Sequence, residues 1–262
     1  MCIGLRGAGR RHSLARQTVR DAQAGQQMKF DDIPGWFMPI DQAAFSWVLQ
    51  HQNRAQPLGG LVELGVFKGK SAVVMGNFQR PGEVFTVCDL FEDIETDSHA
   101  DPEEQRFFKG QSLSQMEFER NYLAFHRELP RIVRAPTAVI TRHVAPGSAR
   151  FVHVDAGHTY DLVRADTASA RTLLRDDGVV VFDDYRKAGA MGCGAAVWEA
   201  ILNEGLRPIA NTEFKLYATW GDPAPYIAEI EARARDAGWC RTKRPTMIRD
   251  MPMVYLHRSP GN

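Results

Sequence analysis

The chain has 262 residues, a length that suits one sizeable α/β domain better than two small ones. With 44% hydrophobic and 24% charged residues, its composition is that of an ordinary globular protein. The formal net charge is zero, so no overall field favours nucleic acid or a membrane, and we expect a small-molecule partner. Four scattered cysteines without a C-x-x-C pair argue against a zinc ribbon or a dithiol redox motif and favour a reducing cytoplasm.

The first 27 residues differ from the rest of the chain. They contain five arginines and many Gly, Ala and Gln residues, without the hydrophobic stretch of a secretion signal. We expect a disordered basic leader over residues 1–27, or a protein that starts at Met28, followed by one domain over residues 28–262. A basic arm or a targeting peptide is the alternative for this leader.

From Gly60 onward, short apolar runs alternate with amphipathic stretches. Strands are predicted over residues 60–65, 83–90, 137–141, 150–155 and 178–183, and helices over 71–78 and 159–175. Continuous Val and Phe runs, rather than strict alternation, suit strands that are covered on both faces of a parallel sheet. The repeated strand–helix–strand order predicts a Rossmann-like, doubly wound α/β fold. We expect seven strands, with the last one antiparallel.

Two regions fall outside this alternation. Residues 91–130 form a long insertion after the second predicted strand, with Phe118, Tyr122, Phe125 and Leu129 at helical spacing. An insertion of this length predicts a helical cap over the site. The tail holds a predicted strand over residues 215–220, a helix over 224–237 and a closing strand over 253–257.

A glycine-containing turn follows the first predicted strand, in the segment ELGVFKGKS at residues 63–71. Gly65 and Gly69 allow a sharp turn and a close approach to a ligand, and the next helix offers free backbone amides. Leu64 stands where a Walker phosphate loop needs glycine, and the G-x-G-x-x-G fingerprint is absent. Asp89 ends the second predicted strand, where an acid can accept hydrogen bonds from both ribose hydroxyls. Any βα turn can need such glycines, so it is the combination with Asp89 that favours a nucleoside site.

Four segments in this order, GLVELGVFKGKSA, FTVCDLFED, RFVHVDAGHTYDLVRAD and GVVVFDDY, resemble class I methyltransferases. Within these, the pattern is similar to the bacterial macrocin-type sugar O-methyltransferases, over about residues 34–220. The resemblance implies S-adenosyl-L-methionine (SAM) as cofactor, with Asp89 at its ribose. It also implies that four residues surround the amino-acid end of SAM: Glu63, Gly65, Phe67 and Ser71.

Two further expectations come from the same resemblance. Trp36 belongs to a Gly-Trp segment that lies over the site in these enzymes, which makes Trp36 a lid residue. The segment after the third strand commonly helps to hold the adenine in relatives. Here only residues 142–149 separate the third and fourth predicted strands, too few for a full crossover helix, so no adenine-binding residue is predicted.

Acidic residues end the fourth and fifth predicted strands. Asp155 ends one, and Asp183 and Asp184 end the other. Neighbouring parallel strands would bring these carboxylates together, where protonation or a cation relieves their repulsion. Oxygen ligands favour Mg²⁺, Mn²⁺ or Ca²⁺, which would hold an acceptor hydroxyl and lower its pKa. Divalent-metal O-methyltransferases, including the catechol enzyme, draw ligands from these strand ends, whereas a single Asp could equally cap a loop.

His158 lies three residues after Asp155, at the position where catechol-type enzymes carry a lysine base. A histidine of near-neutral pKa can deprotonate an alcohol, so His158 is the predicted base beside Asp155. The alternative is a histidine that only binds backbone in its turn. His143 is the second-choice base, and His153 is expected to point away from the site with a structural role.

These features together predict a Mg²⁺-dependent, SAM-dependent O-methyltransferase that acts on a hydroxyl of a sugar or a glycosylated small molecule. Tyr160 and Tyr185 are predicted to line its pocket, with core packing as the ordinary alternative. A metal-independent methyltransferase of phenols or amines and a non-catalytic nucleotide-binding module stay open as alternatives. The expected partner is the acceptor, not nucleic acid or a membrane, and dimerisation is expected for this group.

Overall fold

The computed structural model describes residues 28–96, 101–244 and 251–259. The chain divides into two compact units, residues 1–33 and residues 34–262. In the first unit, residues 28–33 are described and contain one 3-10 turn, η1 (Phe30–Asp32). The predicted disordered leader over residues 1–27 lies outside the described residues. No helix among the described residues is long and apolar enough to cross a membrane.

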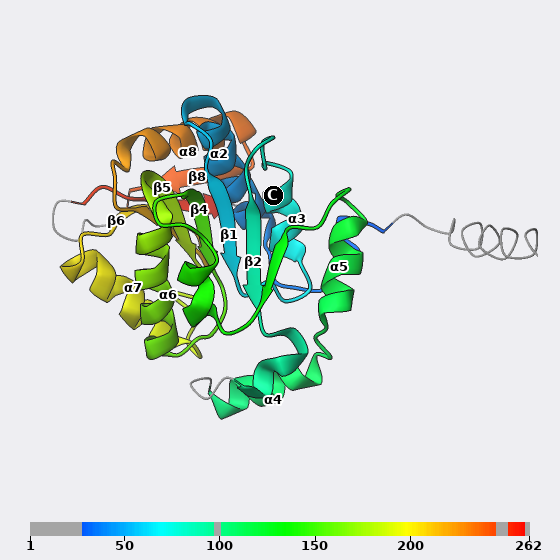
Figure 1. Ribbon diagram of the computed structural model, residues 1–262. Coiled ribbons are helices and arrows are strands. Elements are labelled where there is room, and N and C mark those ends of the chain that lie inside the picture. The colour runs from blue at the N-terminus through cyan, green and yellow to red at the C-terminus, as the bar shows by residue number, and fades with distance from the viewer. Residues whose placement is uncertain (1–27, 97–100, 245–250, 260–262) are drawn as a thin grey trace, which may run out of the picture. The chain divides into compact units, whose positions relative to one another are not determined.

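One nine-stranded sheet forms the second unit, in the order β3-β2-β1-β4-β5-β7-β6-β9-β8 (Figure 1). Its first five strands are parallel: β1 (Gly60–Leu64), β2 (Phe85–Asp89), β3 (Arg131–Arg134), β4 (Ala149–Val154) and β5 (Leu174–Phe182). The other four are β6 (Arg207–Asn211), β7 (Leu216–Thr219), β8 (Cys240–Lys243) and β9 (Val254–Arg258). Strand β7 runs antiparallel to β5 and β6, and β8 runs antiparallel to β9.

The predicted Rossmann-like fold is confirmed, with two differences in the sheet. It has nine strands instead of seven, because the short strands β6 and β8 were not predicted. The last strand in the chain, β9, runs parallel to β6, so the expectation of an antiparallel last strand is wrong. The antiparallel strands are β7, which is inserted between β5 and β6, and β8, which lies at the edge of the sheet.

Helices cover the sheet in two groups. Helix α6 (Tyr160–Leu173) packs against α7 (Met191–Asn203), and α2 (Pro39–Ala55) packs against both α3 (Lys70–Gly76) and α8 (Ala224–Ala237) (Figure 1). The central strands are buried along their length, as every residue of β4 shows. This burial explains their nearly continuous apolar sequences.

The third predicted strand is wrong. Residues 137–141 lie in a 3-10 helix, η3 (Thr137–Arg142), whose Val139 and Ile140 pack against the core. The third strand is β3, further upstream, which lies at the edge of the sheet and buries only Val133. An edge strand with little burial needs no apolar run, so its sequence carried no signal. The connection to β4 is therefore residues 135–148, longer than predicted.

The insertion over residues 91–130 contains η2 (Phe91–Thr96), α4 (Pro102–Gly110) and α5 (Gln115–Leu123). Helix α5 begins after Ser114, whose hydroxyl accepts a hydrogen bond from the Glu117 N–H, as an N-cap does. The predicted helical spacing holds for Phe118 and Tyr122, which are buried. It fails for the two residues beyond the helix, Phe125 and Leu129, which are exposed.

Candidate active site

Asp89, at the end of β2, organises the glycine-containing loop that follows β1. Its Oδ2 accepts hydrogen bonds from the backbone N–H groups of Val66 (2.7 Å) and Phe67 (3.0 Å). Its Oδ1 accepts a third from the N–H of Phe91 at 2.7 Å. Burial raises the pKa of Asp89 above its usual value, although these three bonds favour the ionised form. Asp89, which is predicted to bind the ribose, therefore also holds this loop in place.

Gly65 brings this loop against the end of β4. Its φ is +80°, and a Cβ at this position would lie 2.1 Å from the backbone oxygen of Asp155. Only glycine fits such an approach, because any side chain would force the two strand ends apart. The ends of β1, β2 and β4 thus meet at one edge of the sheet, as their topology requires.

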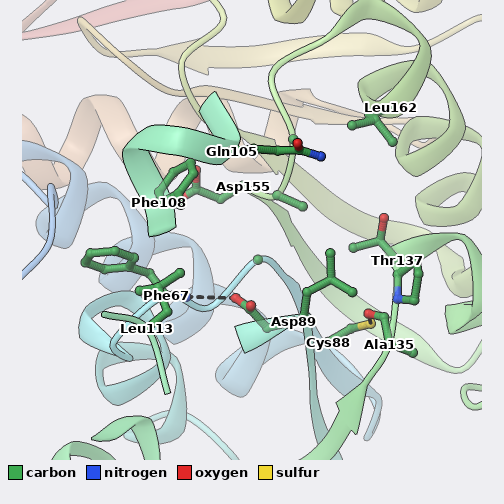
Figure 2. A pocket seen from close by; sticks show the side chains of 15 residues that line it. Phe67, Cys88, Asp89, Gln105, Phe108, Leu113, Ala135, Thr137, Asp155 and Leu162 are labelled. Carbon is green, nitrogen blue, oxygen red and sulfur yellow. Dashed lines mark hydrogen bonds between the residues drawn. The ribbon is translucent and has the colours of Figure 1, made fainter. Parts of the chain in front are cut away.

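A cavity of about 90 Å³ opens beside Asp89. Figure 2 shows Phe67 and Phe108 on one side of this cavity and Thr137 and Leu162 on the other. Its lining is mostly apolar, with Asp89 and Asp155 as its acidic residues. Apolar walls with a few placed polar groups are typical of small-molecule sites, although this cavity alone is smaller than such sites usually are. The sequence predicts none of the walls at Pro136, Thr137 and Leu162, because the predicted strand over residues 137–141 leaves too short a segment before the fourth strand to assign adenine-binding residues.

A second, larger cavity of about 850 Å³ meets the first at Gly65, Phe67, Phe108 and Asp155, which line both. Its size lies within the range of about 300–1,000 Å³ that is usual for small-molecule sites. Four of its charged residues stand at strand ends or at the start of β7: Asp155, Asp183, Asp184 and Lys215. Two joined cavities at the carboxyl ends of the strands can hold a nucleoside and a second molecule side by side.

Aromatic residues form the mouth of the larger cavity. The Trp36 side chain is 66% exposed, and its ring centroid lies 5.5 Å from that of Phe67 and 5.9 Å from that of Phe107. Tyr160 also lines this cavity, and its hydroxyl donates a hydrogen bond to Glu199. Tyr185 lines neither cavity: it is buried in the core, where its hydroxyl accepts a hydrogen bond from Asn211.

His158 pairs with Asp184 in the lining of the larger cavity. Its Nε2 lies 3.0 Å from Asp184 Oδ2, and the Lys187 Nζ lies 2.5 Å from the same oxygen. Although burial opposes ionisation, hydrogen bonds from His158 and Lys187 hold the pKa of Asp184 below its usual value. A carboxylate that binds one ring nitrogen fixes the orientation of the imidazole ring. His143, the second-choice base, lines neither cavity.

Asp155 and Asp183 lie together, as predicted, but Asp184 does not join them. The ligand atoms of Asp155, Asp183 and His153 all lie within 4.8 Å of one another. Asp184 faces His158 and Lys187 instead. The expectation that His153 points away is wrong, since its Nε2 lies 3.9 Å from Asp155 Oδ2. Residues 153 and 155 alternate with Val154, so both project to the same side of β4.

Lys215, which was not predicted, lies within this group. Its Nζ is 2.7 Å from Asp183 Oδ2 and 3.1 Å from His153 Nε2, and its side chain is only 2% exposed. Although burial opposes its charged form, the surrounding carboxylates raise the pKa of Lys215. Burial and the neighbouring Asp183 raise the pKa of Asp155 well above its usual value. The Lys215 ammonium, acting against burial, lowers the pKa of Asp183.

The predicted divalent-metal site does not fit these residues. A Mg²⁺ ion bound at about 2.1 Å to Asp183 Oδ2 would lie no more than about 5 Å from the Lys215 nitrogen. At an effective dielectric constant of about 20, the repulsion between these charges is on the order of 7 kcal/mol or more. Asp183 Oδ2 and His153 Nε2, which would bind the ion, contact the Lys215 ammonium instead.

Glu63 lies beneath the larger cavity and lines neither cavity. Its Oε1 accepts hydrogen bonds from the Ser71 hydroxyl and from His153 Nδ1, the latter at 2.8 Å. Burial raises the pKa of Glu63 to about 8. Of these residues, Ser71 reaches the cavity. Glu63 therefore orients Ser71 and His153 from below.

Comparison with known proteins agrees with this geometry. Residues 62–185 match the family model described as a methyltransferase domain. The chain is similar in structure to the O-methyltransferase NovP, with a TM-score of 0.57 and 19% identity, over 70% of this chain and 80% of that one. A protein from Corynebacterium glutamicum gives a TM-score of 0.50 and 14% identity, over 82% of this chain and 92% of that one. Comparison with curated proteins gives no match.

These likenesses establish the α/β fold of the chain, since it is the fold that structures of such low identity share. They do not single out the macrocin-type group, which stays a prediction. They also leave the acceptor and the role of each site residue to be argued from the chain itself.

Proposed function

We propose that this protein is a SAM-dependent O-methyltransferase of a small molecule, with His158 as its general base. The observation that carries this proposal is the His158–Asp184 pair. It lines a cavity that joins the apolar cavity beside Asp89. The match of residues 62–185 to a methyltransferase domain supports the same reaction.

The two cavities suggest how the cofactor lies. The ribose would bind Asp89, the adenine would lie between the apolar walls near Pro136 and Leu162, and the amino-acid end would reach Ser71. The sulfonium would then stand near Gly65 and Asp155, where the cavities meet.

The chain's own residues would orient the acceptor and remove one proton. SAM supplies an electrophilic methyl group, so the acceptor oxygen forms a C–O bond as the C–S bond breaks and its electron pair stays on sulfur. His158 takes the hydroxyl proton, and Asp184 stabilises the imidazolium that results. Holding the oxygen in line with the methyl group provides most of the remaining rate enhancement.

A sugar or a glycosylated molecule is the acceptor that we propose. The larger cavity offers several carboxylates, including Asp41 and Asp184, that can accept hydrogen bonds from neighbouring hydroxyls. Trp36 and Phe107 at its mouth offer apolar faces to an aglycone or to a sugar ring. A phenol would use the aromatic rim but would bring fewer hydroxyl groups to these carboxylates.

The test combines S-adenosylhomocysteine (SAH) binding with transfer of labelled methyl groups from SAM to paired glycosylated and phenolic acceptors. We expect His158→Gln to keep SAH affinity and to lower kcat about 10²–10⁴-fold, the usual contribution of a general base. His143→Gln is the matched control, because His143 lies outside both cavities, and it should behave as the wild type. SAH binding without transfer to any acceptor would favour a non-catalytic module, and an unimpaired His158→Gln would exclude His158 as the base.

A further inference from the structure

Lys215 is placed by the pairing of β7 with β5. In this antiparallel pair Phe182 lies opposite Leu216 and Val181 opposite Tyr217, so the next step puts Asp183 opposite Lys215. Cross-strand neighbours in an antiparallel sheet project to the same face. The turn before β7 is also held, because the Thr212 hydroxyl accepts a hydrogen bond from the Lys215 N–H at 3.0 Å. The position of Lys215 beside Asp183 is thus built into the sheet.

The surroundings of the ammonium are those of a bound cation. Its Nζ contacts Asp183 Oδ2 at 2.7 Å and His153 Nε2 at 3.1 Å. The ring centroids of Phe37 and Phe45 lie 5.5 Å and 5.8 Å away, within the range of cation–π attraction. A buried charge needs partners of this kind, and two of them, the Asp183 oxygen and the His153 nitrogen, are atoms that could also bind a divalent ion.

The contacts of His153 show that both of its ring nitrogens already have partners within the protein. Lys215 is a donor, so His153 Nε2 accepts, and the Nδ1–H is left to donate to Glu63 Oε1 at 2.8 Å. Glu63 and His153 lie opposite each other in the β1–β4 register, which fixes this contact. Both ring nitrogens are therefore used within the protein, and neither is available to a metal while Lys215 is in place.

We propose that the Lys215 ammonium takes the place of a divalent cation at the Asp155–Asp183 pair, so that methyl transfer by this protein needs no metal. Lys215 is a positioning residue: it fixes the Asp183 carboxylate at the floor of the larger cavity, where the acceptor hydroxyl would be held. This inference rests on the proposed function for its catalytic part, but its metal-binding part can be tested without any turnover.

The first experiment uses the wild-type protein after exhaustive dialysis against EDTA. We expect methyl transfer to be unchanged by EDTA and by added Mg²⁺, and Mn²⁺ titration followed by electron paramagnetic resonance to show no one-to-one site. Loss of turnover in EDTA with recovery on adding Mg²⁺ would overturn the proposal. So would one-to-one Mn²⁺ binding that disappears in Asp183→Asn.

The second experiment removes the cation with Lys215→Met, which keeps a long unbranched side chain. The freed atoms of His153, Asp155 and Asp183 lie close enough to hold an ion, so this variant should gain a Mn²⁺ site. We expect its turnover without metal to fall at least 100-fold and to recover at least 10-fold with Mn²⁺, while SAH affinity stays the same. Lys215→Arg should keep metal-independent turnover above that of Lys215→Met.

Lys187→Met is the matched control for metal binding, because it removes a lysine of the same cavity that contacts Asp184 instead of Asp183. It should gain no Mn²⁺ site. A folded Lys215→Met that binds no Mn²⁺ would overturn the proposal, and circular dichroism establishes that the variant is folded. If Lys215→Met does not fold, the EDTA and Mn²⁺ experiments on the wild-type protein test the proposal. If no acceptor is methylated under any condition, the proposed function fails, yet the Mn²⁺ titrations still test the role of Lys215.

Discussion

Replacing Asp89 with Asn tests whether this side chain holds the cofactor loop. The carboxylate accepts three backbone N–H bonds, two at Oδ2 and one at Oδ1. An amide can keep its oxygen toward Val66 and Phe67, but its NH₂ then faces the N–H of Phe91. One bond is lost and two donors oppose each other, which costs about 2–4 kcal/mol at a buried site. The loop that lines both cavities should loosen accordingly.

The assay is SAH binding by isothermal titration calorimetry at neutral pH. If ordering the loop is required for binding, 2 kcal/mol corresponds to a Kd about 30-fold higher, and we expect at least this change. Asp93→Asn is the matched control. Asp93 is an exposed acid four residues further on, bound to Arg134 at 2.7 Å outside both cavities, and its variant should keep wild-type affinity.

One result would refute this reasoning. Burial raises the pKa of Asp89, which favours its protonated form. If Asp89 is protonated in the folded protein, replacement by Asn has almost no effect on the loop. Unchanged SAH affinity together with an unchanged melting temperature would therefore show that Asp89 is uncharged in the folded protein, and that charge plays no part in holding the loop.

Two further predictions concern stability. Hydrogen bonds from Arg150 and Arg80, acting against burial, lower the pKa of the fully buried Glu83 from 4.5 to about 2. A lowered native pKa stabilises the fold above pH 4.5, and this contribution, on the order of 3 kcal/mol, is lost as the pH falls toward 2. Urea unfolding between pH 6 and 2.5 measures the loss, which should be much smaller in Glu83→Gln, itself destabilised at neutral pH. Gly65→Ala should cost about 3 kcal/mol or more, because its Cβ would lie 2.1 Å from the Asp155 oxygen at a φ of +80°. A melting temperature within 2 °C of the wild type, which corresponds to about 1 kcal/mol or less, would contradict that clash.

The sequence was informative where strands are buried on both faces. Strands β1, β2 and β4 and the second half of β5 are largely apolar, and each of these strands is followed or ended by glycine or aspartate, so the positions of these segments and their ligand-facing ends could be predicted. Strand β3 begins and ends with arginine because it lies at the edge, and β6 and β8 are short strands of mixed composition. Edge and peripheral strands are set by their neighbours rather than by their own pattern.

The same distinction applies to the candidate site. Asp155 and Asp183 could be paired from the sequence, because adjacent parallel strands bring their carboxyl ends together. The place of Asp184 could not, since it depends on a backbone turn: its φ is +54°, and its carboxylate faces His158 instead of Asp183. A single residue in the left-handed region separates two neighbouring aspartates into two different pairs.

Lys215 was outside the reach of sequence analysis for a topological reason. It follows a polar turn and precedes a short strand, a pattern that is typical of an exposed lysine. Its environment depends on β7 being inserted between β5 and β6 and on the register that sets Leu216 opposite Phe182. A shift of that register by one residue would turn Lys215 to the other face of the sheet and leave Asp183 and His153 without their cation. The charge balance of the candidate site therefore depends on the register of one antiparallel pair, as much as on the identity of the acids that the motifs revealed.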